Sequence, residues 1–145
     1  MPIDAEHYRK LERLYAYAPV TQWYGATIRV DDGTAEVEIA IRPEFHHAAH
    51  AVHGSVYFRA LDDAAFFAAN SKVSDAFVLT VSFSIYFLRP VKDGVLRARG
   101  RVVGGGARLF TAESHLFDGT GTLLAQGTGV FTRSSIPLDP SVGYE

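Results

Sequence analysis

The sequence predicts an α+β fold, in which an antiparallel sheet of about six strands wraps around one long central helix and an extra helix lies at the N-terminus. Two observations support this prediction. Apolar residues recur at helical spacing through His53–Lys72, and they alternate at a period of two in the segments that follow. Short turns separate those segments, which indicates antiparallel neighbours, and a helix that is apolar over more than half its surface needs a sheet to cover it.

The composition narrows the class of protein. The 145 residues, 48% of them apolar, are enough for one domain over residues 1–145 with its own core. A formal net charge of −2 gives no basic excess for binding nucleic acid. The absence of cysteine excludes disulfides, thiolate metal ligands and cysteine nucleophiles. Charges are scattered through the N-terminal segment, so we expect neither a signal peptide nor a membrane span there. We therefore expect a cytoplasmic location.

The chain before the central helix is predicted to form one helix and a hairpin. Asp4 can cap a helix over about 4–17, and Pro19 ends it. A strand around 23–30 and a second one over 35–41 follow, joined by an Asp-Asp-Gly turn. The second strand alternates apolar residues with glutamates, which indicates one buried face and one exposed face.

Four strands are predicted after the central helix, at residues 77–88, 95–103, about 108–117 and about 123–132. The first alternates over twelve residues, and an Asp-Gly-Thr-Gly turn joins the last two. The glycine run 104–106 should break or bend the chain. The tail over about 134–145 has two prolines and little periodicity, so we expect it to be loosely held. Pairing of two subunits is the simplest way to cover the free edges of such a sheet.

The central helix has one face of small and apolar residues and one polar face. The first face comprises Tyr57, Ala60, Leu61, Ala64 and Ala68, and the second comprises Ser55, Arg59, Asp62, Asp63, Phe66 and Asn70. Because Gly54 and Ser55 follow a histidine-rich loop, the free N–H groups of the first helical turn should point into a polar space.

A motif at the start of this helix resembles a known family. His53-Gly54-Ser55, six further residues and then Asp62-Asp63-Ala64 are similar to the pattern of the hotdog-fold acyl-CoA thioesterases of the phenylacetate-degradation (PaaI-like) type, and the similarity runs from about 24 to 131. The resemblance implies the hotdog fold and a homodimer or dimer of dimers with sites shared between subunits. It also implies an acyl-CoA substrate, with coenzyme A as part of that substrate and no separate cofactor.

Two positions depart from the family pattern. Ser55 replaces the second glycine, which is a mild change because the N–H is retained. His47 stands where the family often has an asparagine that helps to hold the water or the carbonyl. An imidazole at this position can do the same, act as a base, or indicate a different reaction.

Thioester hydrolysis needs an activated water or a carboxylate nucleophile, and donors for the carbonyl oxygen. We predict that the Gly54 N–H polarises the carbonyl and that Asp62 is the general base or the nucleophile, two roles that the sequence does not separate. The alternative for Asp62 is a salt bridge with Arg59 at i,i+3. Asp63, at i+4 from Arg59, is expected to be structural. Thr80 is a further catalytic candidate, although it can equally be an ordinary strand hydroxyl.

The remaining candidates concern metals and substrate binding. Four histidines fall within eight residues (His46, His47, His50 and His53), but their spacing matches no standard ligand pattern, so no metal is predicted. His53 and Ser55 are predicted to contact the substrate. The resemblance also implies that Gly106 and Arg108 contact the phosphates of coenzyme A, although a glycine run is more often a bulge and strand arginines are usually solvated.

The leading hypothesis is therefore an acyl-CoA thioesterase that is neither a nucleic-acid-binding nor a membrane protein. One alternative is a hotdog hydratase or dehydratase of 3-hydroxyacyl thioesters, in which His47 or His53 and Asp62 transfer protons. Another is a module that binds acyl-CoA without catalysis. The aromatic residues near the helix do not identify the acyl group, because aromatic side chains fill cores more often than they line pockets.

Overall fold

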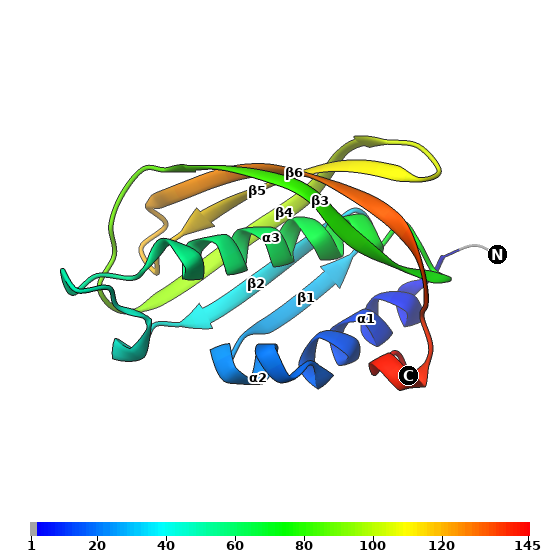
Figure 1. The fold of residues 1–145 in the computed structure, drawn as a ribbon, viewed down its shortest axis with the longest axis horizontal. Coiled ribbons are helices and arrows are strands. Elements are labelled where there is room, and N and C mark those ends of the chain that lie inside the picture. The colour runs from blue at the N-terminus through cyan, green and yellow to red at the C-terminus, as the bar shows by residue number, and fades with distance from the viewer. Residues whose placement is uncertain (1–2) are drawn as a thin grey trace.

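The computed structural model describes residues 3–145 and has the predicted architecture (Figure 1). The elements are α1 (Ala5–Tyr17), α2 (Pro19–Tyr24), β1 (Thr27–Asp31), β2 (Thr34–Ala40), a 3-10 turn (Pro43–Phe45), α3 (Gly54–Asn70), β3 (Ala76–Phe87), β4 (Val95–Gly105), β5 (Leu109–Phe117), β6 (Leu123–Pro137) and a second 3-10 turn (Pro140–Val142). All neighbouring strands are antiparallel, in the order β1-β2-β4-β5-β6-β3. The sheet curves around α3, which confirms the predicted α+β fold.

Helix α3 packs on the sheet through its smallest residues. Ala60, Ala64 and Ala68 are fully buried, as the predicted apolar face requires. On β4, Gly100 lies directly beneath the helix, and a Cβ atom at this position would be 2.3 Å from the carbonyl oxygen of Ala64. The absence of side-chain bulk on both elements therefore lets the helix backbone touch the sheet, and this contact sets the height of α3 above the strands.

Strand β3 does not alternate without interruption, and the sequence prediction is wrong on this point. Its pairing with β6 shifts register between Thr80 and Ser82, which is a β-bulge. Val78 is buried before the bulge, whereas Phe83 and Ile85 pack into the core after it. The extra residue reverses which side chains face α3, so Thr80 and Phe83 both point toward the helix.

Two terminal segments also differ from the prediction. Trp23 and Tyr24 belong to α2 and not to a strand, because Pro19 begins a new helix and Gly25, at a φ of 68°, ends it in the left-handed conformation. The tail over 134–145 is held by the protein. Strand β6 continues to Pro137, and the hydroxyl of Tyr144 lies 2.8 Å from Nδ1 of His7 on α1. These contacts join residues that are distant in sequence, so local periodicity does not report them.

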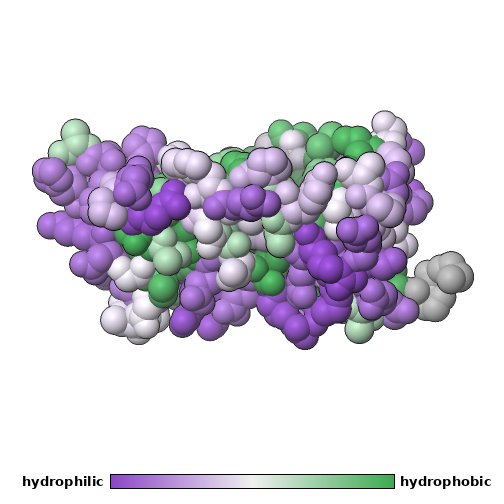
Figure 2. All heavy atoms as spheres, turned by 90° about the horizontal axis from the view of Figure 1, so that it is seen from below, coloured by the Kyte–Doolittle hydropathy of each residue, from purple (hydrophilic) through white to green (hydrophobic). Residues whose placement is uncertain are grey.

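The predicted hairpins and the first helix are confirmed. Asp4 caps α1, Gly33 at a φ of 70° turns the chain between β1 and β2, and a bulge at the glycine run bends the end of β4. Seen from the side of α1 and α2, the molecule is mostly hydrophilic with small apolar patches (Figure 2). Among residues 3–145, no helix has both the length and the apolarity to cross a membrane.

The contact of α3 with β4 predicts a large effect of one methyl group. Gly100→Ala should lower the free energy of unfolding by at least about 2 kcal/mol, because the new Cβ collides with the backbone of α3. Gly104→Ala is the matched control on the same strand, since a Cβ there meets nothing within 4 Å. Urea unfolding of both variants measures the difference, and equal stabilities would show that α3 does not lie this close to β4.

Candidate active site

Asp62 lies in the middle of α3 and faces the bulged part of β3. The Thr80 hydroxyl donates a hydrogen bond of 3.0 Å to its Oδ1. Burial raises the pKa of the Asp62 carboxyl above its ordinary value, against the opposing effects of this hydrogen bond and of the Arg59 charge. A carboxyl with a raised pKa that one hydroxyl orients is a suitable base for water or a suitable nucleophile. The structure thus brings two of the predicted residues, Asp62 and Thr80, into contact.

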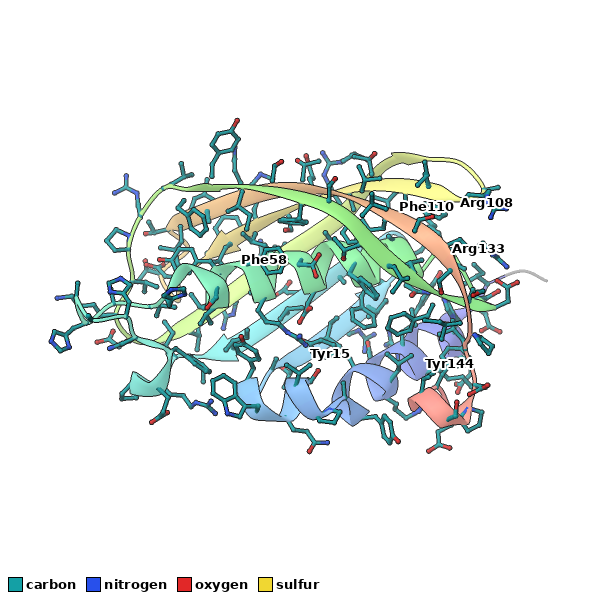
Figure 3. All side chains as sticks on the ribbon, in the orientation of Figure 1. Tyr15, Phe58, Arg108, Phe110, Arg133 and Tyr144 are labelled. Carbon is teal, nitrogen blue, oxygen red and sulfur yellow. The ribbon has the colours of Figure 1, made fainter. Side chains whose placement is uncertain are left out.

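Asp63 has a different environment from its neighbour. Its side chain is buried and accepts a hydrogen bond of 2.6 Å from the Tyr15 hydroxyl, which reaches it from α1 (Figure 3). Arg59 Nε lies 2.7 Å from Asp63 Oδ2. Burial raises the pKa of Asp63 to about 7, with a smaller contribution from the Asp62 charge, although Arg59 and Tyr15 lower it. Asp63 therefore ties α1 to α3, in keeping with the structural role predicted for it.

Arg59 is the residue that distinguishes the two aspartates. It makes its ion pair with Asp63 at i,i+4, and its guanidinium also donates to the Thr21 hydroxyl at 3.3 Å. Within the described chain, residues 3–145, no ion pair joins Arg59 to Asp62. The salt-bridge alternative for Asp62 therefore does not describe this geometry, and Oδ2 of Asp62 has no hydrogen-bond or ion-pair partner among the described residues.

The first turn of α3 presents a backbone donor. The His53 Nδ1 atom accepts a hydrogen bond of 3.0 Å from the Ser55 N–H and lies 2.8 Å from the Ser55 hydroxyl, so these two side chains satisfy each other. None of the described residues accepts a hydrogen bond from the Gly54 N–H. This N–H stands at the positive end of the helix dipole and is able to bind a carbonyl oxygen.

Gly54 and His47 line one cavity of about 410 Å³, walled by Tyr57 and Phe87. The ring centroids of His47 and His53 are 6.5 Å apart, while His47 Nδ1 accepts a hydrogen bond from the Ala49 N–H. His46 instead bonds to the Lys92 carbonyl. Within residues 3–145 no group of three or more side chains is arranged to hold a metal ion.

The predicted residues do not form one cluster within the chain. Gly54 and Asp62 are eight residues apart on one helix, a rise of about 12 Å, and they line different cavities. Gly106 and Arg108 lie in the β4–β5 loop, at the opposite end of the molecule from the N-terminus of α3 (Figures 1 and 3). The structure therefore contains a donor group, a carboxylate group and a distant basic loop.

Sequence reasoning missed the part of the site that α1 and α2 supply. A cavity of about 240 Å³ beside Asp62 is lined by Tyr15, Thr21 and Phe77 among others. No local signal in the first helix shows which residues it meets. Those contacts depend on how α1 docks on α3, which is a tertiary property.

A long helix wrapped by a six-stranded antiparallel sheet is the arrangement of the hotdog fold. The PaaI protein of the phenylacetic acid degradation operon of Escherichia coli has the same fold, with a TM-score of 0.85 over 94% of this chain and 99% of that protein, at 20% identity. A phenylacetic acid degradation-related protein of Ralstonia eutropha is similar at a TM-score of 0.75 and 26% identity, over 85% of this chain and 98% of that one.

Residues 49–125 match the model of the thioesterase superfamily, and the chain belongs to this family. The match includes Gly54, Asp62 and Thr80. A relative from Saccharolobus solfataricus, named "Putative esterase SSO2140", is 29% identical over 131 residues, which are 88% of this chain and 89% of the relative. The family and this relative support a thioester hydrolase in general terms. The resemblance inferred from the helix motif is therefore confirmed.

The buried Asp63 predicts how stability depends on pH. Its folded pKa of about 7 lies above its ordinary value, so between about pH 4 and pH 7 the folded protein keeps a proton that the unfolded chain has lost. The free energy of unfolding should fall over this window as the pH rises, by roughly 2–4 kcal/mol more than in Asp63→Asn. Urea unfolding of both proteins at several pH values measures this difference, and parallel curves would contradict the raised pKa.

Proposed function

We propose that this protein is an acyl-CoA thioesterase that hydrolyses the thioester to a free acid and coenzyme A. The observation that carries the proposal is the Asp62 carboxyl, which is partly desolvated, bonded to Thr80 and free of an ion pair with Arg59. The Gly54 N–H, which has no acceptor among residues 3–145, supports it, since acyl transfer needs a donor where the carbonyl oxygen becomes negative. Membership of the thioesterase superfamily fits both groups.

In the proposed reaction the thioester carbonyl accepts a hydrogen bond from the Gly54 N–H. Asp62 then removes a proton from water as the water oxygen attacks the carbonyl carbon, and the carbon–sulfur bond breaks as the thiolate leaves and takes up a proton. In the second version the Asp62 carboxylate attacks the carbonyl carbon and expels the coenzyme A thiolate, which takes up a proton. Water then hydrolyses the mixed anhydride to the free acid and the Asp62 carboxylate. Thr80 orients the carboxylate in either version.

We propose further that each site is shared by two subunits. One thioester carbonyl cannot meet Gly54 and Asp62 of the same chain, because about 12 Å of helix separates them. Strand β3 is an edge of the sheet, and Leu79 and Val81 on it are 43% and 60% exposed. Pairing of two such edges about a two-fold axis would cover these apolar residues and place the helices in opposite directions. A homodimer, or a dimer of two such dimers, follows from this arrangement.

The proposal keeps the predicted substrate contacts. His53 and Ser55 flank the donor, and Gly106 and Arg108 would meet the phosphates of coenzyme A from the β4–β5 loop, with no cofactor beyond the substrate itself. A cytoplasmic location remains part of the proposal. The hydratase alternative is favoured by one observation, which is that His47 lines the same cavity as Gly54.

The first test is release of free thiol from a panel of acyl-CoA substrates. Asp62→Asn should lower kcat by about 10²–10⁴-fold, because the general base or nucleophile is lost. The adjacent and isosteric Asp63→Asn should keep kcat within about tenfold of the wild type. Equal losses in the two variants would remove the special role of Asp62. Hydration of enoyl-CoA without thiol release would support the hydratase, and tight binding without turnover would support a binding module.

The shared site is tested by combining two inactive variants. Gly54→Pro removes the donor N–H, and proline suits the first helical position after the extended His53. Its kcat should fall by about 10²–10³-fold, while Gly54→Ala, which keeps the N–H, serves as the control for the added Cβ.

The test uses a heterodimer of one Gly54→Pro chain and one Asp62→Asn chain, purified through two different tags. If each site takes Gly54 from one chain and Asp62 from the other, this heterodimer has one intact site. It should therefore recover about half of the wild-type activity. An inactive heterodimer of folded chains would place both groups in a single-chain site.

A further inference from the structure

The cavity beside Asp62 has properties that the proposed reaction does not yet use. It lies between α1, α2, α3 and β3 and has a volume of about 240 Å³. Most of its wall is apolar, with Leu14 and Ala18 on the N-terminal side and Phe66, Phe67 and Phe77 on the other. The ring centroid of Phe66 lies 5.0 Å from that of Phe67 and 5.3 Å from that of Phe77, so the three rings form a continuous aromatic wall.

The polar groups of this cavity are already paired, with one exception. Tyr15 and Arg59 bind Asp63, and the Thr21 hydroxyl accepts from Arg59. Asp62 uses one oxygen to accept from Thr80, and it is the group that remains available to a ligand at this wall. An apolar cavity with one reactive carboxylate in its wall suits a ligand whose apolar part fills the space and whose reactive carbon meets the carboxylate.

We propose that this cavity binds the acyl group of the substrate, and that the acyl group is apolar, uncharged and of about eight carbon atoms. The inference rests on the proposed thioesterase function. A volume of about 240 Å³ holds roughly eight non-hydrogen atoms at about 30 Å³ each. This corresponds to a linear chain of about eight carbons or to one aromatic ring with one or two further carbons.

Charge excludes a second class of acyl group. A dicarboxylic acyl chain would bring a carboxylate next to Asp62 and Asp63, and the cation in the wall, Arg59, is already paired with Asp63. A buried carboxylate without a free partner is strongly unfavourable. The cavity should therefore reject succinyl and similar groups although they are small enough to enter.

The walls on α1 and α2 are the part of the site that limits acyl length. Ala18 connects these two helices and lines the cavity with a single methyl group. A larger side chain at this position would occupy space otherwise open to the ligand. Phe66 lies opposite on α3, one helical turn after Asp62, and a smaller side chain there would lengthen the cavity.

The test uses binding and turnover together in the full-length protein. Isothermal titration calorimetry with S-ethyl-, S-octyl- and S-dodecyl-CoA measures binding affinity without catalysis, because these thioethers cannot be hydrolysed. In the wild type S-octyl-CoA should bind best. Ala18→Leu should weaken the binding of S-octyl-CoA by about tenfold or more and change the binding of S-ethyl-CoA by less than about twofold. Phe66→Leu should shift the preference toward S-dodecyl-CoA. Phe117→Leu, on the outer face of the sheet, is the control and should leave the order unchanged.

Rates with acetyl-, octanoyl-, benzoyl-, phenylacetyl-, dodecanoyl- and succinyl-CoA complete the experiment. The kcat/KM values should follow the same order as the binding affinities, with the value for succinyl-CoA at least about tenfold below that for octanoyl-CoA. Comparison of the aryl with the linear substrates shows which of the two acyl shapes, an aromatic ring or a linear chain, fits the cavity. If thioesters are cleaved but neither variant changes the length preference, the acyl-site inference is wrong and the proposed function stands. If the thioethers bind in the predicted order but nothing is cleaved, the proposed function is wrong and the cavity remains an acyl site.

Discussion

The structure depends on the contact between the backbone of α3 and strand β4. Gly100 has no side chain and the helix presents alanines to it, so the two backbones meet without intervening atoms. This contact sets the position and rotation of α3 in the curved sheet. Three groups of the candidate site lie on or against this helix, since Gly54 begins it, Asp62 lies at its middle, and Thr80 meets it from β3.

Two adjacent aspartates show how environment assigns different roles to one residue type. Successive helical residues point about 100° apart, so Asp62 faces β3 and its cavity while Asp63 faces α1. Asp63 takes the Arg59 charge and the Tyr15 hydroxyl and becomes part of the packing. Burial raises the pKa of the Asp62 carboxyl, although the Thr80 hydrogen bond and the Arg59 charge lower it, and the pairing of Arg59 with Asp63 leaves Asp62 without an ion pair to Arg59. Asp63 thus serves the packing of α1 on α3, while Asp62 remains available to a ligand.

The two halves of the proposed chemistry lie apart on one helix, and in the proposed dimer they would meet between subunits. The donor at the N-terminus of α3 and the carboxylate two turns later belong to different cavities of one chain. The open edge of β3 offers the surface through which a second chain can bring its own half. The added helices α1 and α2 stand outside the six-stranded body, so the residues that they contribute to the proposed acyl site can vary without a change in the helix that bears Asp62.

Local sequence patterns were enough to predict the class of fold, the order of the six strands along the chain, the long helix and the spacing of Gly54 and Asp62. These features depend on periodicity and on neighbours a few residues away, which a sequence records directly. The bulge after Thr80, the docked tail, and the cavity under α1 and α2 follow from the packing of the folded chain. Each of these depends on contacts between segments far apart in the chain, and its free energy depends on how the elements pack and not on local propensity.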